Sequence, residues 1–105
     1  MNDKFLSLLG IARRAGRLMS GHDAVKEAVR GSKANLIIFT TEASQRLRDE
    51  FQRLSEGKNI TLLNTEYTIN DIYSATGGRA AVSALTDTGF SQRLIELYEE
   101  KHKEV

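Results

Sequence analysis

Three arginines within five residues form the first group in the sequence that could bind a ligand. Arg13, Arg14 and Arg17 follow the apolar positions of a predicted first helix. A guanidinium group holds a phosphate through two parallel hydrogen bonds, so this run favours a phosphate-binding surface. The run is equally compatible with a solvated helix end, where cations suit the negative end of the helix dipole.

The next residues predict a short strand followed by a helix start. We expect the strand at Arg17–Met19 and the first helical turn at Ser20–Asp23. Ser20 suits the N-cap position, and Asp23 would complete a capping box. A helix start offers unpaired N–H groups and a positive dipole end, which favour an anion, and Gly21 would let that ligand approach closely.

Three polar side chains of this second helix could read a nucleobase. Lys26 follows His22 by four residues and so shares its helix face. An i, i+3 pair of Asp23 with Lys26 would be worth only tenths of a kcal/mol, which leaves both groups free for a ligand. Asp23 could accept from base N–H groups while Lys26 donates to a base or phosphate. The alternative is that Ser20 and Asp23 only cap the start of the helix.

A glycine loop supplies a second candidate for anion binding. Gly77, Gly78 and Arg79 follow a predicted short helix. Two glycines permit a backbone nest for an anion, and Arg79 adds positive charge, although a plain turn would show the same residues. For Tyr73 we expect core packing rather than base stacking.

Charge is segregated along the chain. The whole sequence has a formal net charge of +1, but residues 1–33 carry seven Lys or Arg and three Asp or Glu, whereas residues 34–105 carry eight and eleven. A negatively charged partner would therefore be attracted to the first third of the chain.

Several classes of site are disfavoured. Cysteine is absent, and the histidines His22 and His102 show no metal-ligand spacing, so we expect no metal. No Gly-rich cofactor motif follows a strand, so we expect no cofactor. No apolar run could span a bilayer and no signal-peptide layout is visible, so we expect a cytoplasmic protein without a membrane partner.

Hydrophobic periodicity predicts one domain over residues 1–105, with helices alternating with four strands. Asn2 or Asp3 would cap the first helix and Gly16 would follow it, and Thr68 with Asp71 forms a second predicted capping box. Beyond the second helix, which Gly31 would end, the predicted elements are a strand at Ala34–Thr40, a helix at Thr41–Ser55, a strand at Ile60–Leu63, a helix at Thr68–Ser74, a strand at Ala80–Leu85 and a last helix containing Phe90–Tyr98.

This order predicts an α/β fold with helices on both faces of the sheet. Ligands of open α/β sheets bind beyond the carboxyl ends of strands. We therefore expect the loops Ser20–Asp23, Thr40–Ser44 and Thr76–Arg79 to share one edge.

The chain resembles the ribosomal-protein family that binds kink-turn RNA (the L-seven-Ae and L-thirty-e type), and more closely its bacterial YlxQ-like members. The resemblance covers most of the chain and rests on Leu9–Gly21, Ala34–Ser44 and Thr86–Phe90. It implies a three-layer α/β/α sandwich with a mixed sheet, no enzyme activity, and binding of structured RNA such as ribosomal or kink-turn-like RNA, with the ribosome as a candidate partner.

The resemblance also assigns roles to residues. His22, Asp23 and Lys26 take the positions of the family's Asn-Glu pair and lysine, which read guanines of sheared G·A pairs; the lysine is kept, the acid is shortened and imidazole replaces the amide. Ala75–Arg79 takes the place of the loop that covers a flipped-out base.

We therefore expect a monomeric RNA-binding protein. Arg13, Arg14, Arg17, Lys26 and Arg79 would hold phosphates, Gly21 and Gly77 would permit close approach, and His22 and Asp23 would touch bases. Two alternatives stay open. One is a protein-interaction module that uses Glu96, Glu99, Glu100 and Glu104, and the other is an RNA- or nucleotide-modifying enzyme with Asp23 or His22 as base.

Overall fold

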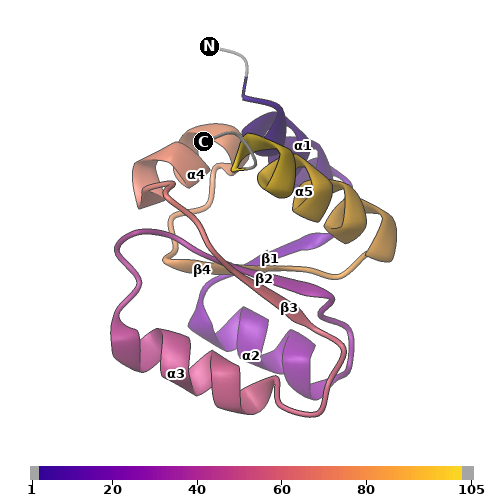
Figure 1. The fold of residues 1–105 in the computed structure, drawn as a ribbon, viewed down its shortest axis with the longest axis vertical. Helices are drawn as coiled ribbons and strands as arrows, with labels where there is room; N and C mark the ends of the chain where they lie inside the picture. Colours follow the sequence, from indigo (N-terminus) through magenta and orange to yellow (C-terminus); the bar gives the residue numbers. More distant parts are fainter. Residues whose placement is uncertain (1–2, 103–105) are drawn as a thin grey trace.

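The computed structural model describes residues 3–102, which form five helices and four strands in alternation. Figure 1 follows them along the chain. The elements are α1 (Lys4–Arg14), β1 (Leu18–Ser20), α2 (His22–Arg30), β2 (Leu36–Phe39), α3 (Gln45–Leu54), β3 (Thr61–Asn64), α4 (Ile69–Thr76), β4 (Val82–Leu85) and α5 (Thr88–Lys101).

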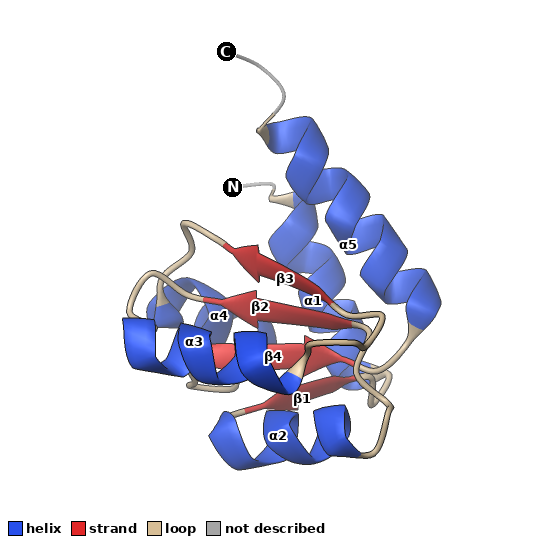
Figure 2. Cartoon of the chain, turned by 60° about the horizontal axis from the view of Figure 1, so that its bottom comes forward, coloured by secondary structure: helices blue, strands red, loops and turns tan. Residues whose placement is uncertain are grey.

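The four strands form one mixed sheet in the order β1-β4-β2-β3, which Figure 2 shows from the side of α2 and α3. β2 pairs in parallel with β3, and β4 pairs antiparallel with both β1 and β2. The predicted α/β fold with a mixed sheet is confirmed.

Both faces of the sheet are covered, because successive side chains of a strand point to opposite faces. In β2, Leu36 and Ile38 join the core under α1, α4 and α5, whereas Ile37 and Phe39 join the core under α2 and α3. All four β2 side chains are buried, as expected for a central strand. Figure 1 shows these two helical layers above and below the sheet.

Helix starts agree with the sequence at two places and differ at two. Asp3 caps α1, while the alternative cap Asn2 lies outside the described residues. Thr68 and Asp71 form the predicted capping box of α4. The prediction that α3 begins at Thr41 is wrong, because Ser44 caps it. The predicted cap of α2 is also wrong, since Ser20 ends β1 and Gly21 occupies the N-cap position.

The connection between α4 and β4 lies two residues further along the chain than predicted. α4 continues through Thr76, and Gly77 ends it with a φ of 81° in the left-handed region that favours glycine. The following strand begins at Val82 rather than at Ala80. Residues 77–81 therefore make the whole connection to the sheet.

No helix within residues 3–102 has the length and apolar character needed to cross a bilayer.

Candidate functional site

The three predicted loops do meet at one edge of the sheet. The N–H of Gly21 donates to the carbonyl of Val82 at 3.0 Å, and the N–H of Thr40 donates to the carbonyl of Ala81 at 3.0 Å. Because β4 runs antiparallel to β1 and β2, its first residues lie beside their last residues. The segment that follows the glycine loop thus ties the end of β1 to the end of β2.

Arg13 lies at this edge, although it belongs to α1. A Cβ atom placed on Gly78 would lie 2.9 Å from Nη1 of Arg13 and 3.2 Å from Oγ of Ser20. The Ser20 hydroxyl is buried and has no hydrogen-bond partner within the described chain. Arg13 forms no salt bridge with any carboxylate of residues 3–102, so its guanidinium group is available to a ligand.

The start of α2 lies at the same edge and is uncapped. The N-cap residue Gly21 has a φ of 98° and provides no side-chain hydrogen bond, whereas side chains cap the other four helices of the described chain. A side chain at Gly21 would meet no atom within 4 Å, so glycine is favoured there by the positive φ rather than by crowding. The first N–H groups of α2 therefore receive no hydrogen bond from an N-cap side chain.

The other two predicted arginines differ in their positions. Arg14 lines a hollow of about 380 Å³ between α1 and α4, beside Asp71, Ser74 and Ala75. Arg17 lies at the opposite end of β1, where its carbonyl accepts the N–H of Thr86 at 2.9 Å. The three residues of β1 separate Arg17 from the loop edge by about 10 Å. The expectation that all three arginines form one surface with the glycine loop is therefore wrong for Arg17, whereas Arg13 lies against Gly78 and Arg14 lines a hollow with Ala75 next to the loop.

Arg17 instead borders a second hollow of about 360 Å³ on the α2 side of the sheet. Met19 and Ala28 contribute apolar atoms to it, and Lys33 contributes a second positive charge.

His22 and Lys26 form a polar cluster with Glu50 of α3. The imidazole Nδ1 lies 3.0 Å from Oδ1 of Asp23, and Nε2 lies 2.9 Å from each oxygen of Glu50. Lys26 Nζ lies 3.7 Å from Oε2 of Glu50. The possible pair of Asp23 with Lys26 is not formed, since each group has another partner.

The cluster favours a charged imidazole. Carboxylates only accept, so both ring nitrogens of His22 must donate to satisfy Asp23 and Glu50. The hydrogen bond that His22 donates to Asp23, followed by the one to Glu50, raises the pKa of His22 above its ordinary value. The hydrogen bond with His22 likewise lowers the pKa of Glu50. The ring of His22 also meets the buried ring of Phe51 edge-on, at 5.6 Å between centroids.

Arg79 folds back onto α4 instead of pointing freely into the loop. Its guanidinium carbon lies 4.3 Å from the ring centroid of Tyr73, and Nη1 donates to Oδ1 of Asn70 at 3.2 Å. Tyr73 is 43% exposed, so the expectation of core packing is wrong. Gly77 has open space in front of it, whereas Gly78 is the glycine in close contact with its neighbours.

Arg48 is a residue that the sequence reasoning missed. Its Nε donates to the carbonyl of Ala43 at 3.1 Å and its Nη2 to that of Thr40 at 3.0 Å, while Nη1 bonds Oδ1 of Asn64. These bonds fix the loop after β2 beside the end of β3. Glu50 was missed as well, because nothing local in the sequence indicates which face of α3 meets α2.

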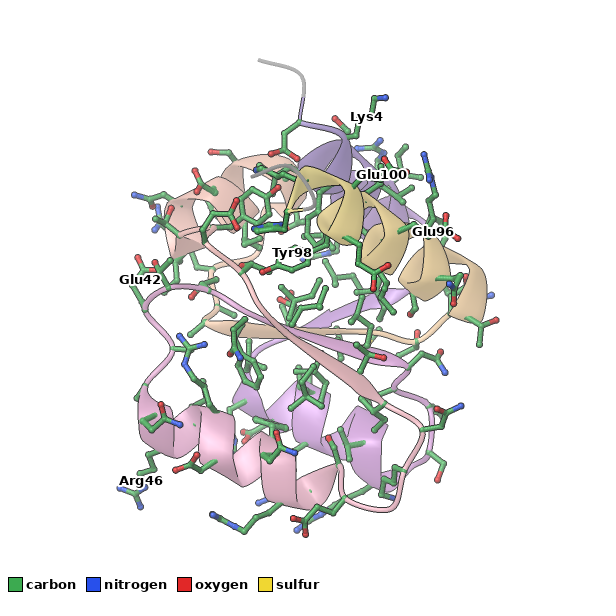
Figure 3. All side chains as sticks on the ribbon, in the orientation of Figure 1. Lys4, Glu42, Arg46, Glu96, Tyr98 and Glu100 are labelled. Atoms are coloured by element: carbon green, nitrogen blue, oxygen red, sulfur yellow. The ribbon has the colours of Figure 1, made fainter. Side chains whose placement is uncertain are left out.

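The acidic groups of α5 are partly neutralised. Arg93 Nη1 lies 3.2 Å from Glu96 and 3.8 Å from Glu100, and Figure 3 shows the two glutamates along this helix. Glu104, the last residue of the acidic set, lies outside the described residues. An acidic docking face on α5 is thus weaker than the sequence suggests.

Comparison with known proteins gives relatives along most of the chain. No family model matches the sequence. A Bacillus subtilis (strain 168) protein named RNA-binding protein YlxQ is 29% identical over 96 residues, which cover 90% of this chain and 94% of the relative. An Enterococcus faecium protein of the same name is 25% identical over 96 residues, covering 91% and 92%.

Solved structures share the fold. A protein with unknown function from Bacillus halodurans C matches with a TM-score of 0.86 and 27% identity, over 93% of this chain and 99% of that one. The Giardia lamblia 15.5kD RNA binding protein matches with a TM-score of 0.73 over 100% of this chain and 93% of that one. At 15% identity, this match shows the fold alone. The resemblance to bacterial YlxQ-like proteins is therefore confirmed along most of the sequence, and the solved structures confirm the α/β/α fold.

Proposed function

We propose that this chain binds structured RNA at the sheet edge where the ends of β1 and β2 meet the start of β4. The observation that carries this proposal is the position of Arg13, which lies against Gly78 near the uncapped start of α2 and has no carboxylate partner among the described residues. An unpaired guanidinium next to free helix N–H groups suits a phosphate of a nucleic-acid backbone.

The names of the relatives support RNA as the ligand. Two proteins that align with this chain over more than nine-tenths of their own length are named as RNA-binding. We propose that residues 1–105 act as one RNA-binding domain, monomeric and cytoplasmic, without enzymatic activity.

The proposed contacts divide by chemistry. Arg13 and the first N–H groups of α2 hold phosphates, while the fully exposed carboxylate of Asp23 accepts from base N–H groups. Arg79 stacked on Tyr73 adds charge on the α4 side of the same edge. We propose kink-turn-like or ribosomal RNA as the ligand, because the start of α2 and the glycine loop stand at one edge and can meet two segments of a bent RNA together.

A salt titration tests the proposal. A kink-turn RNA stem and a straight duplex of equal length are titrated with the protein at several salt concentrations. Replacing Arg13 by Ala should weaken binding and reduce the log K against log salt slope by about one unit, since one phosphate contact is lost.

The matched control is Arg53→Ala, which removes the same charge from the last turn of α3, at the opposite end of that helix from the Thr40–Ser44 loop. Equal effects of the two substitutions would refute the proposed surface. Equal affinity for the bent and straight RNAs would refute the proposed ligand class but not the surface.

A further inference from the structure

The carboxylate of Glu50 pairs with two cationic side chains that an RNA ligand would contact. His22 and Lys26 lie in the first two turns of α2, next to the free N–H groups at its start. Oε2 of Glu50 lies 2.9 Å from Nε2 of His22 and 3.7 Å from Nζ of Lys26, so one oxygen bridges both. An anionic group from α3 thus stands where a phosphate oxygen could stand.

We propose that Glu50 is an intramolecular competitor of RNA, which a phosphate must displace from His22 and Lys26 before those residues contact the ligand. This inference rests on the RNA-binding function proposed above. It assigns Glu50 the role of limiting affinity at the α2 side of the surface, a role that none of the local sequence patterns indicates.

The geometry favours a contact that forms in the free protein and opens readily. The Glu50 side chain keeps 29% of its exposure, the Lys26 side chain 31% and the His22 side chain 42%, so water reaches all three groups. Exposed ion pairs in such positions change an equilibrium constant by about five-fold at most. A backbone phosphate carries one negative charge over two oxygens, as the carboxylate does, so it can replace the carboxylate when the RNA makes further contacts along the same surface.

Neighbouring groups hold the cations in place when Glu50 leaves. The buried ring of Phe51 supports His22 edge-on, and Asp23 remains bonded to Nδ1. Lys26 is anchored on α2, whose side chains Val25 and Val29 are buried against the sheet. Displacement of Glu50 thus exposes two preformed cations rather than an unordered segment.

Removal of the competing charge should strengthen RNA binding. Glu50→Gln is expected to tighten binding of the kink-turn RNA stem about two- to five-fold at low salt, and to steepen the salt slope by about one unit because a cation is freed. Glu56→Gln serves as the control for net charge, since Glu56 is exposed just beyond α3 and forms no salt bridge within residues 3–102.

A double-mutant cycle identifies the route of the effect. In a Lys26→Ala background, Glu50→Gln should lose most of its gain, because one of the two cations it frees is gone. In parallel, NMR titration of His22 in the free protein should show its pKa falling towards the ordinary value in the Glu50→Gln variant. An unchanged titration would mean that the contact is absent in solution and would overturn the inference.

Each result of the binding experiment either supports or overturns the competitor role of Glu50. Binding by Glu50→Gln that is weaker than wild type, or no tighter than binding by Glu56→Gln, overturns the competitor role while leaving RNA binding itself intact. Failure of the wild-type chain to bind the RNA stem even at low salt overturns the proposed function instead.

Discussion

Gly78 lies against Arg13, so that a methyl group on the glycine would stand 2.9 Å from a guanidinium nitrogen. The two residues come from the connection before β4 and from the last turn of α1. Their contact brings a positive charge from one helical layer to the edge of the sheet. It links the arginine run to the glycine loop.

Replacing Gly78 by Ala should weaken RNA binding without unfolding the protein. The new methyl group would push aside the Arg13 side chain, whose far end is flexible, while Oγ of Ser20 lies 3.2 Å away and must shift slightly. We expect a loss of affinity of a few-fold and a change in unfolding free energy below about 1 kcal/mol. RNA titration and urea denaturation measure the two quantities.

Gly89→Ala is the control for this substitution. Its methyl group would also meet a side chain at close range, the Asp87 carboxylate at 3.2 Å, which accepts the N–H of Phe90 at the start of α5. The explanation requires that Gly78→Ala has no further effect once Arg13 is Ala. A full effect in that background would show that the glycine acts independently of the arginine.

Gly10→Ala should destabilise the fold, although alanine is the better helix former. A Cβ atom at Gly10 would lie 2.6 Å from the backbone carbonyl oxygen of Ala75, which cannot rotate away. The strain of overpacking, about 1–3 kcal/mol, exceeds the helix-propensity gain of about 1 kcal/mol at most. Urea denaturation should therefore show a net loss of stability, whereas a gain would mean that α1 and α4 are not packed this closely.

The protein should lose stability at high pH, where Tyr67 loses its proton in the unfolded chain. Its hydroxyl donates to Asp3 at 2.8 Å, and burial followed by this hydrogen bond raises the pKa of Tyr67 to about 12. Between the ordinary value of about 10 and this value, the folded chain keeps a proton that the unfolded chain loses. Stability is therefore complete below about pH 10 and falls as the pH rises towards 12.

Denaturation at pH 9, 10 and 11 checks this dependence. Tyr67→Phe should cost about 1–2 kcal/mol at neutral pH, because a hydrogen bond to a charged group is lost, and should flatten the alkaline decline. Part of the decline should persist, since Lys101 lies 3.2 Å from the Tyr67 hydroxyl and its pKa is also raised. Tyr73→Phe is the control. If stability falls as little at alkaline pH in Tyr73→Phe as in Tyr67→Phe, the decline cannot be assigned to Tyr67.

Much of the fold could be predicted from local patterns. The run Leu36–Phe39 is apolar at every position, which indicates a strand covered on both faces, and it is the central strand beside β4 and β3. Thr68 and Asp71 stand three residues apart and form the capping box that this spacing implies. Such features depend on neighbours within one turn or one strand, so the sequence alone contains them.

The boundaries near the site could not be predicted in the same way. Ser20 has the side chain of an N-cap, but pairing of β1 with β4 extends the strand through it. Gly21 then becomes the cap, and the start of α2 stays open. Strand pairing with residues more than 60 positions away therefore overrode a local capping preference.

For the candidate site, the sequence by itself determined which residues carry charge and that the loops Ser20–Asp23 and Thr40–Ser44 follow strand ends, because helices and strands alternate along the chain. The glycine loop precedes β4, so it reaches the same edge because β4 runs antiparallel to β1 and β2, which the tertiary structure decided. Only the tertiary structure decided which charges meet. It directs Arg13 to that edge, leaves Arg17 at the other end of β1, and places Glu50 against His22 and Lys26. Contacts between α2 and α3 follow from the packing of both helices on one sheet face, and no local pattern records that packing.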